Sequence, residues 1–151
     1  MDVNIEMIPS YKIAYIRRKG PYGSDNVPIM EQLKNWAIEK NLLCEASIIL
    51  GIAQDNPEFT APKDCRYDVG LVVLDKFKVD NNYINFGEII PGKYCVFKIN
   101  HTAEAMKKAW LDMFSELSKR SYEIDNKRPI IERYSMKLIN KHCCEICVPI
   151  L

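Results

Sequence analysis

The sequence predicts a single α+β domain made of two tandem, pseudo-symmetric βαββ modules, with one antiparallel sheet, two helices on one face and a cleft between the halves. Two observations lead to this fold class. The order strand, helix, strand, strand occurs twice along the 151 residues. The two copies also align at a constant offset of 81 residues, Lys12 with Lys93 and Gly51 with Glu132. The repeat halves cover approximately residues 1–82 and 83–151.

The first half is expected to contain one helix among several strands. Pro28 suits the first turn of a helix, because its missing N–H is not needed there. Period-2 alternation and intervening turn residues predict the strands. The apolar stripe of the helix is Ile29, Leu33, Trp36 and Ala37. The predicted elements are extended segments over 3–7 and 11–18, a helix over 28–40, and strands over 47–53 and 65–74.

The second half repeats this order. Thr102 is a suitable N-cap, because its hydroxyl can accept a hydrogen bond from a free backbone N–H. The apolar face of the helix that follows consists of Met106, Trp110, Met113, Phe114 and Leu117. The predicted elements are strands over 83–90 and 93–100, a helix over 103–119, and strands over 130–137 and 143–150.

The charge balance argues against nucleic acid as a direct partner. The chain has 21 Lys and Arg against 20 Asp and Glu, a net charge of +1, whereas nucleic-acid-binding domains carry a basic patch. The longest apolar run, residues 48–53, is far shorter than the ~20 residues that cross a bilayer. The N-terminal residues lack the basic start and apolar stretch of a secretory signal. We therefore expect a cytoplasmic protein with no membrane partner.

The six cysteines are expected to be reduced and mostly buried. The run 142–147 (HCCEIC) resembles a metal knuckle, but the Val-Pro-Ile that follows continues it as a strand. Residues three apart in a strand point to opposite faces, so Cys144 and Cys147 could not hold one ion. No second Cys-x-x-Cys completes four ligands, and no glycine-rich phosphate loop occurs. We expect neither a metal site nor a cofactor.

Glu132 departs from the pattern of its strand. Alternation places it on one face with Ile130, Tyr134 and Met136, which are apolar or aromatic. It could be an exposed edge residue, or it could pair with a basic neighbour such as Arg66. A carboxylate in an apolar, aromatic-lined cavity has two uses instead. It can pair with a cationic ligand, or its raised pKa can make it a general base or acid near neutral pH.

The repeat makes this position asymmetric, because the residue pseudo-equivalent to Glu132 is Gly51. A cleft between the halves would then hold one carboxylate and not a pair. Trp36 and Trp110 occupy the apolar stripes of the two helices and would face the same sheet near this junction. Aromatic residues at helical spacing commonly fill a core, so each tryptophan has a structural interpretation beside the ligand-binding one.

Several short motifs, taken in order, resemble those of the GyrI-like small-molecule-binding domains. That family includes effector-binding domains of multidrug-responsive transcription regulators, bacterial DNA gyrase inhibitory proteins and stand-alone hydrolases of cyclopropane-bearing toxins. The motifs are Gly20-Pro21-Tyr22, Asp55-Asn56-Pro57, Cys65-Arg66-Tyr67-Asp68, Ile90-Pro91-Gly92-Lys93-Tyr94, Trp110, Tyr122-Glu123, Pro129-Ile130-Ile131-Glu132-Arg133-Tyr134 and a Val-Pro-Ile ending. His101-Thr102-Ala103 departs from the family, where many members carry a glycine in this turn.

The resemblance implies two βαββ modules of the SHS2 type, with a cavity between them and a central glutamate. The glutamate corresponds to Glu132. The aromatic walls correspond to Tyr22, Tyr67, Trp110 and Tyr134, while Trp36 is placed only by its helix stripe. No helix-turn-helix precedes these motifs, so we expect a stand-alone ligand domain.

Three functions are compatible with these residues. We favour a module that captures cationic or amphipathic aromatic compounds, with Glu132 as the countercharge. The runner-up is a hydrolase in which Glu132 activates a water that attacks a strained ring, with Tyr134 or Tyr67 donating a hydrogen bond. The third is a protein-interaction module like the gyrase inhibitory relatives, which would have a protein partner. No second catalytic pattern is present, since His101 and His142 fit no Ser/His/Asp or Cys/His arrangement.

Overall fold

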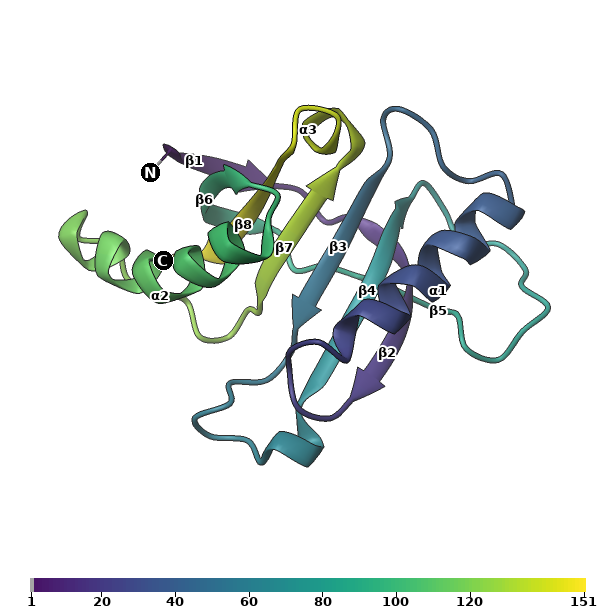
Figure 1. Cartoon of the computed structure of the whole chain (residues 1–151), viewed down its shortest axis with the longest axis horizontal. Coiled ribbons are helices and arrows are strands. Elements are labelled where there is room, and N and C mark those ends of the chain that lie inside the picture. The colour runs from purple at the N-terminus through teal and green to yellow at the C-terminus, as the bar shows by residue number, and fades with distance from the viewer. Residues whose placement is uncertain (1) are drawn as a thin grey trace.

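The computed structural model describes residues 2–151, which form one eight-stranded antiparallel sheet in the order β1-β6-β8-β7-β3-β4-β2-β5 (Figure 1). The strands are β1 (Asp2–Ile8), β2 (Lys12–Lys19), β3 (Ile48–Ala53), β4 (Arg66–Val73), β5 (Asn85–Glu88), β6 (Gly92–Asn100), β7 (Ile130–Ser135) and β8 (Cys143–Pro149). The helices are α1 (Asn26–Glu39), the 3-10 turn η1 (Pro62–Asp64), α2 (Ala103–Lys119) and α3 (Met136–Ile139). The predicted α+β class is confirmed.

The pseudo-twofold relation between the modules passes through the middle of the sheet. Strands β3 and β7 are antiparallel neighbours, and their register pairs Gly51 directly with Glu132. These two residues are also the ones that the 81-residue offset relates. A residue pair that is both cross-strand neighbours and pseudo-equivalent must lie on the pseudo-axis. Glu132 therefore stands at the junction of the two halves.

The edge strands are exchanged between the modules. Strand β1 pairs with β6 along its whole length, from Asp2 opposite Lys98 to Ile8 opposite Gly92. Strand β5 pairs with β2 at the other edge of the sheet. Each module is thus completed by a strand from the other half of the sequence. The exchange ties the two modules together through backbone hydrogen bonds.

Helices α1 and α2 cover the same face of the sheet, one over each module (Figure 1). Leu33 and Trp36 of α1 pack on Ile49 and Val69, and the α2 side chains pack on β6 and β8. The other face carries its own apolar cluster. Its buried members are Ile8, Ile13, Leu50, Ile52, Ile89, Tyr94, Val96, Ile131 and Cys147. Alternate residues of the central strands thus serve two separate cores.

Thr102 caps α2 as predicted, since its hydroxyl accepts a hydrogen bond from the backbone N–H of Ala105. The prediction of a strand over 130–137 was two residues too long. Strand β7 ends at Ser135, whose hydroxyl accepts from the N–H of Leu138 and caps α3. Met136 therefore opens a helical turn and does not share the strand face of Glu132.

Smaller differences concern element ends and the cysteines. Helix α1 begins at Asn26, before Pro28, and β5 is shorter than the predicted strand over 83–90. Cys144 and Cys147 are both buried, and Cys147 belongs to the core on the side away from the helices. Within residues 2–151 no helix is long and apolar enough to cross a membrane.

Candidate functional site

Glu132 lies in β7 on the face that the helices cover, between β8 and β3. Its side chain is half-buried. Tyr67 of β4, which is only 5% exposed, donates a hydrogen bond from its hydroxyl to Glu132 Oε1 at 2.8 Å. Register makes this contact possible, since Gly51 of β3 pairs with Glu132 on one side and with Val69 of β4 on the other.

Gly51 provides the space for this hydrogen bond. A Cβ atom at Gly51 would lie 2.2 Å from the Tyr67 hydroxyl oxygen and 3.1 Å from Glu132 Oε1. Any side chain at this position would displace the tyrosine. The asymmetry of the repeat, glycine in one half and glutamate in the other, is therefore a packing requirement as well as a chemical one.

The surroundings of Glu132 favour its neutral form. Burial raises the pKa of Glu132 above its ordinary value of 4.5, and the side-chain donors of Tyr67, Trp110 and Tyr134 act in the opposite direction. Burial also raises the pKa of Tyr67 and Tyr134, and the nearby Glu132 charge adds to the rise. Both hydroxyls therefore keep their protons at neutral pH and can serve as donors.

Among residues 2–151, no basic side chain pairs with Glu132. The alternative in which Arg66 neutralises it is wrong, because Arg66 makes its ion pair with Asp55 at 2.9 Å. No lysine, arginine or histidine among residues 2–151 forms a salt bridge with Glu132. The carboxyl is thus held by neutral hydrogen-bond donors alone.

Tyr22, another predicted site residue, contacts Tyr67. Their rings meet edge to face, with centroids 6.2 Å apart. The Tyr22 hydroxyl donates to the carbonyl of Arg66 at 2.7 Å and accepts from the N–H of Asp55 at 3.0 Å. Tyr22 therefore positions Tyr67, and its own polar group is already engaged.

Trp36 of α1 points into the core between this helix and the sheet. It is 2% exposed and stacks on Phe77, with ring centroids 6.1 Å apart and the planes 6° from parallel. Trp110 of α2 is only half-buried and is one of the donors that act on Glu132. The two tryptophans, which look equivalent in the sequence, thus have different surroundings.

Two residues near the site were missed by the sequence reasoning. The ring of His101, in the turn between β6 and α2, lies 5.6 Å from that of Tyr134. Cys144 is buried in β8, and its thiol pKa is raised to about 12 by burial and by the charge of Glu132. The departure of the 101–103 turn from the family pattern was the available signal for His101.

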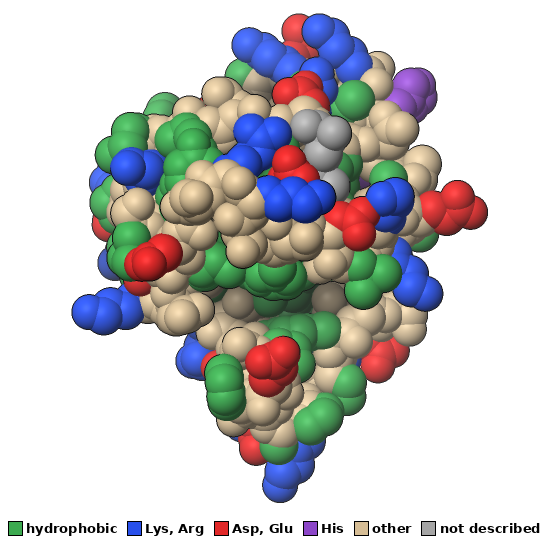
Figure 2. All heavy atoms as spheres, turned by 90° about the vertical axis from the view of Figure 1, so that its left-hand side faces the viewer, with side chains coloured by type: hydrophobic (Ala, Val, Ile, Leu, Met, Phe, Trp, Pro, Cys, Tyr) green, Lys and Arg blue, Asp and Glu red, His purple; other side chains and the backbone are tan. Residues whose placement is uncertain are grey.

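The surface on the side of α2, β1 and β6 is hollowed, and hydrophobic side chains line the hollow (Figure 2). Charged side chains stand around it, with Lys and Arg interspersed among Asp and Glu. This side of the molecule shows no continuous basic patch of the kind that binds a phosphate backbone.

The sequence matches one protein-family model over residues 1–151, and that family is described as the GyrI-like small molecule binding domain. A similar protein is YosT of the SPbeta prophage in Bacillus subtilis (strain 168), which is named as a transcriptional regulator. It is 43% identical over 151 residues, which are 99% of this chain and 99% of YosT.

Solved structures share the fold at low sequence identity. The C-terminal domain of EcmrR superposes with a TM-score of 0.75 at 14% identity, over 99% of this chain and 97% of that one. In the EcmrR–DNA complex the match spans 57% of the EcmrR chain, with a TM-score of 0.74. SAV2435 bound to tetraphenylphosphonium superposes with a TM-score of 0.60 at 12% identity, over 100% of this chain and 94% of that one.

Proposed function

Because the chain belongs to the GyrI-like small molecule binding domain family, we propose that it binds a cationic or amphipathic aromatic compound against Glu132. The observation that carries the proposal is a half-buried carboxyl group without a basic partner, surrounded by aromatic donors. Such a group is costly to ionise alone, and a cation that approaches it removes that cost.

The aromatic residues supply the remaining affinity. Tyr67 donates a hydrogen bond to this carboxyl, and Trp110 and Tyr134 are near enough to lower its pKa, so a flat cation that reaches Glu132 also meets aromatic side chains. A desolvated cation–π contact contributes about 2 kcal/mol, whereas micromolar affinity needs about 8 kcal/mol. Several aromatic contacts and the ion pair must therefore act together. The structure of SAV2435 with tetraphenylphosphonium supports this ligand class, since that protein has the same fold.

A titration with tetraphenylphosphonium tests the proposal, with the quenching of tryptophan fluorescence as the signal. Triphenylphosphine oxide serves as a neutral aromatic control ligand. Glu132→Gln should weaken the cation much more than the neutral compound, because only the cation uses the negative charge. Glu123→Gln, which removes an exposed carboxylate, is the matched control and should leave both affinities unchanged. Equal weakening of both ligands by Glu132→Gln would refute the ion-pair role.

Hydrolysis is a second candidate, favoured by the raised pKa of Glu132. A carboxylate whose pKa is shifted toward neutrality can accept a proton from a water that attacks a strained electrophilic ring. The new C–O bond replaces a ring C–C bond, whose electron pair passes to the other ring carbon and its electron-withdrawing substituent. The hydroxyl of Tyr67 or Tyr134 could donate a hydrogen bond to that substituent, and the proton taken up by Glu132 would then pass to the carbanion. Mass spectrometry after incubation with a cyclopropane-bearing electrophile would show product formation. Loss of the general base should reduce the rate by about 10²–10⁴-fold in Glu132→Gln, and an unchanged rate would exclude this role.

A further inference from the structure

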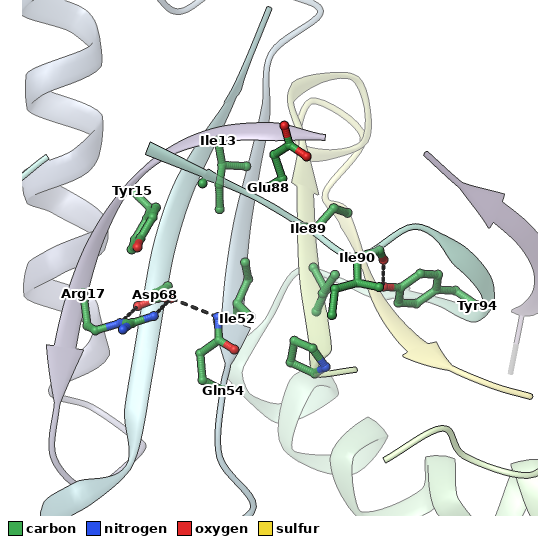
Figure 3. Close-up of a pocket in the computed structure, with 13 residues that line it drawn as sticks. Ile13, Tyr15, Arg17, Ile52, Gln54, Asp68, Glu88, Ile89, Ile90 and Tyr94 are labelled. Carbon is green, nitrogen blue, oxygen red and sulfur yellow. Dashed lines mark hydrogen bonds and ion pairs between the residues drawn. The ribbon is translucent and has the colours of Figure 1, made fainter. Parts of the chain in front are cut away.

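A cavity of about 200 Å³ lies on the face of the sheet opposite the helices (Figure 3). Its walls come from both modules and from the segment between β5 and β6. The apolar lining includes Ile13, Ile52, Ile90, Ile131 and Tyr94. Along the central strands these residues alternate with those around Glu132, because Ile52 follows Gly51 and Ile131 precedes Glu132. The cavity is thus separated from the Glu132 site by the thickness of the sheet.

One end of the cavity is polar and rigidly built. Asp68 is only 2% exposed and receives hydrogen bonds from Arg17 Nε and Nη2, both at 2.8 Å. Gln54 Nε2 donates to the same carboxylate at 3.0 Å. Figure 3 shows these three side chains side by side, away from Ile89, Ile90 and Tyr94. The Tyr94 hydroxyl is held by the carbonyl of Ile90 at 2.7 Å, so this opposite wall is fixed as well.

The polar end keeps hydrogen-bonding capacity of both kinds. Gln54 turns its amide nitrogen to Asp68, and its oxygen accepts no hydrogen bond from residues 2–151. Arg17 Nη1 likewise donates to none of these residues, since only Nε and Nη2 are engaged. An unused acceptor and an unused donor therefore border the same space. A ligand group that accepts and donates side by side would satisfy both.

The charges at this end disfavour an ionic ligand. The Asp68 carboxylate is paired with Arg17 and already accepts three hydrogen bonds, so it is not available to a cation. The positive charge of Arg17 is compensated in the same way. Glu88, the remaining charged residue of the lining, is exposed, lies away from this end and accepts a hydrogen bond from the Ser10 hydroxyl (Figure 3). A neutral group with one carbonyl and one N–H meets these conditions.

We propose that this cavity is a second small-molecule site, for a small neutral molecule with an apolar body and an amide or lactam group. The carbonyl would accept from Arg17 and the N–H would donate to Gln54, with the body between the isoleucines. The volume is below the roughly 300 Å³ at which pockets for drug-sized ligands begin, so the ligand is smaller than a drug.

Benzamide is the probe for this site, since it combines a planar apolar ring with a primary amide. The isoleucine methyl NMR signals, assigned with Ile→Val variants, report where it binds. We expect saturable shifts at Ile13, Ile52 and Ile131 with a dissociation constant on the order of 1 mM. Benzoate and benzylammonium, which are charged analogues of the same size, should bind at least about tenfold more weakly.

Two variants and one control make the test specific. Gln54→Leu should weaken benzamide about tenfold, which corresponds to about 1.4 kcal/mol and to one lost hydrogen bond. Ile131→Phe should abolish the shifts by filling the cavity. Glu132→Gln should leave benzamide binding unchanged, which separates this site from the one on the helix face. The proposal is overturned if the methyl shifts do not saturate, if benzamide shifts the Trp110 indole N–H signal and not these methyl signals, or if a charged analogue binds as well as benzamide.

Discussion

Replacing Gly51 with alanine tests whether the Tyr67–Glu132 hydrogen bond organises the site. The new Cβ would lie 2.2 Å from the Tyr67 hydroxyl oxygen, which is shorter than any tolerated contact. The tyrosine must therefore move away from Glu132 and give up its 2.8 Å hydrogen bond. Gly51 does not require a left-handed backbone conformation, so the effect comes from crowding and not from backbone strain.

The expected cost can be worked out from the separate contributions. Overpacking a well-filled core costs about 1–3 kcal/mol. Losing a hydrogen bond to a carboxylate costs about 1.5–3 kcal/mol, of which part is already included in the crowding. Replacing glycine by alanine restricts the unfolded chain, which stabilises the folded state by about 0.4–1 kcal/mol. We therefore expect Gly51→Ala to lower the free energy of unfolding by about 2–3 kcal/mol.

Urea unfolding of a double-mutant cycle measures this effect. Tyr67→Phe removes the oxygen that the new methyl group would strike, so Gly51→Ala should cost at least about 1 kcal/mol less in the Tyr67→Phe background. The pKa of Glu132, followed by carboxyl NMR, should rise further in Gly51→Ala because the lost Tyr67 donor lowers it in the wild type. Equal costs of Gly51→Ala in both backgrounds would show that Gly51 does not act through Tyr67.

Three further predictions concern the charge of Glu132, the two tryptophans and the cysteines. Glu132→Gln should raise the urea midpoint at pH 7, with the gain vanishing below pH 4.5. Because the pKa of Glu132 is raised in the folded state, protonated Glu132 stabilises the fold at low pH, and this contribution is lost as Glu132 ionises. Glutamine does not ionise, so an equal gain at pH 4 would contradict the prediction. Trp36→Ala should lower the free energy of unfolding by about 3–5 kcal/mol in urea titrations. Trp110→Ala should mainly weaken tetraphenylphosphonium binding, by roughly 30-fold, as measured by calorimetry because this variant lacks the fluorescent side chain at the site. Cys44, which is exposed and has a lowered pKa through the Ser47 hydroxyl, should react with iodoacetamide well before buried Cys144, whose pKa is about 12, as peptide mass spectrometry would show.

Periodicity in the sequence was sufficient to predict most of the fold. Alternating strands, the Thr102 cap and the helical stripe of α2 are local signals, and the structure follows them, except that Phe114 of the predicted stripe is exposed. The repeat at a constant offset also placed Gly51 and Glu132 at equivalent positions. The register of β3 and β7 then made them neighbours. The end of β7 was predicted two residues too late, because the alternating pattern continues through Met136 while the Ser135 side chain caps the helical turn α3.

Partner choice at the site depended on tertiary structure. Trp36 and Trp110 occupy similar positions on the apolar stripes of their helices, yet Trp110 acts on Glu132 and Trp36 is a core residue. Alternation along a strand predicts which face of the sheet a side chain occupies. The distance between two side chains on that face depends on strand order and register.

The sequence by itself therefore determined the element order, the two-module architecture and the position of an unusual carboxyl group, because these follow from short-range periodicity and an internal repeat. Only the tertiary structure decided the exchange of the edge strands, the fit of Tyr67 into the space above Gly51 and the Arg17–Asp68–Gln54 network on the other face. Each of these depends on residues far apart in the chain, whose contacts are set by sheet topology and by the space that neighbouring side chains leave.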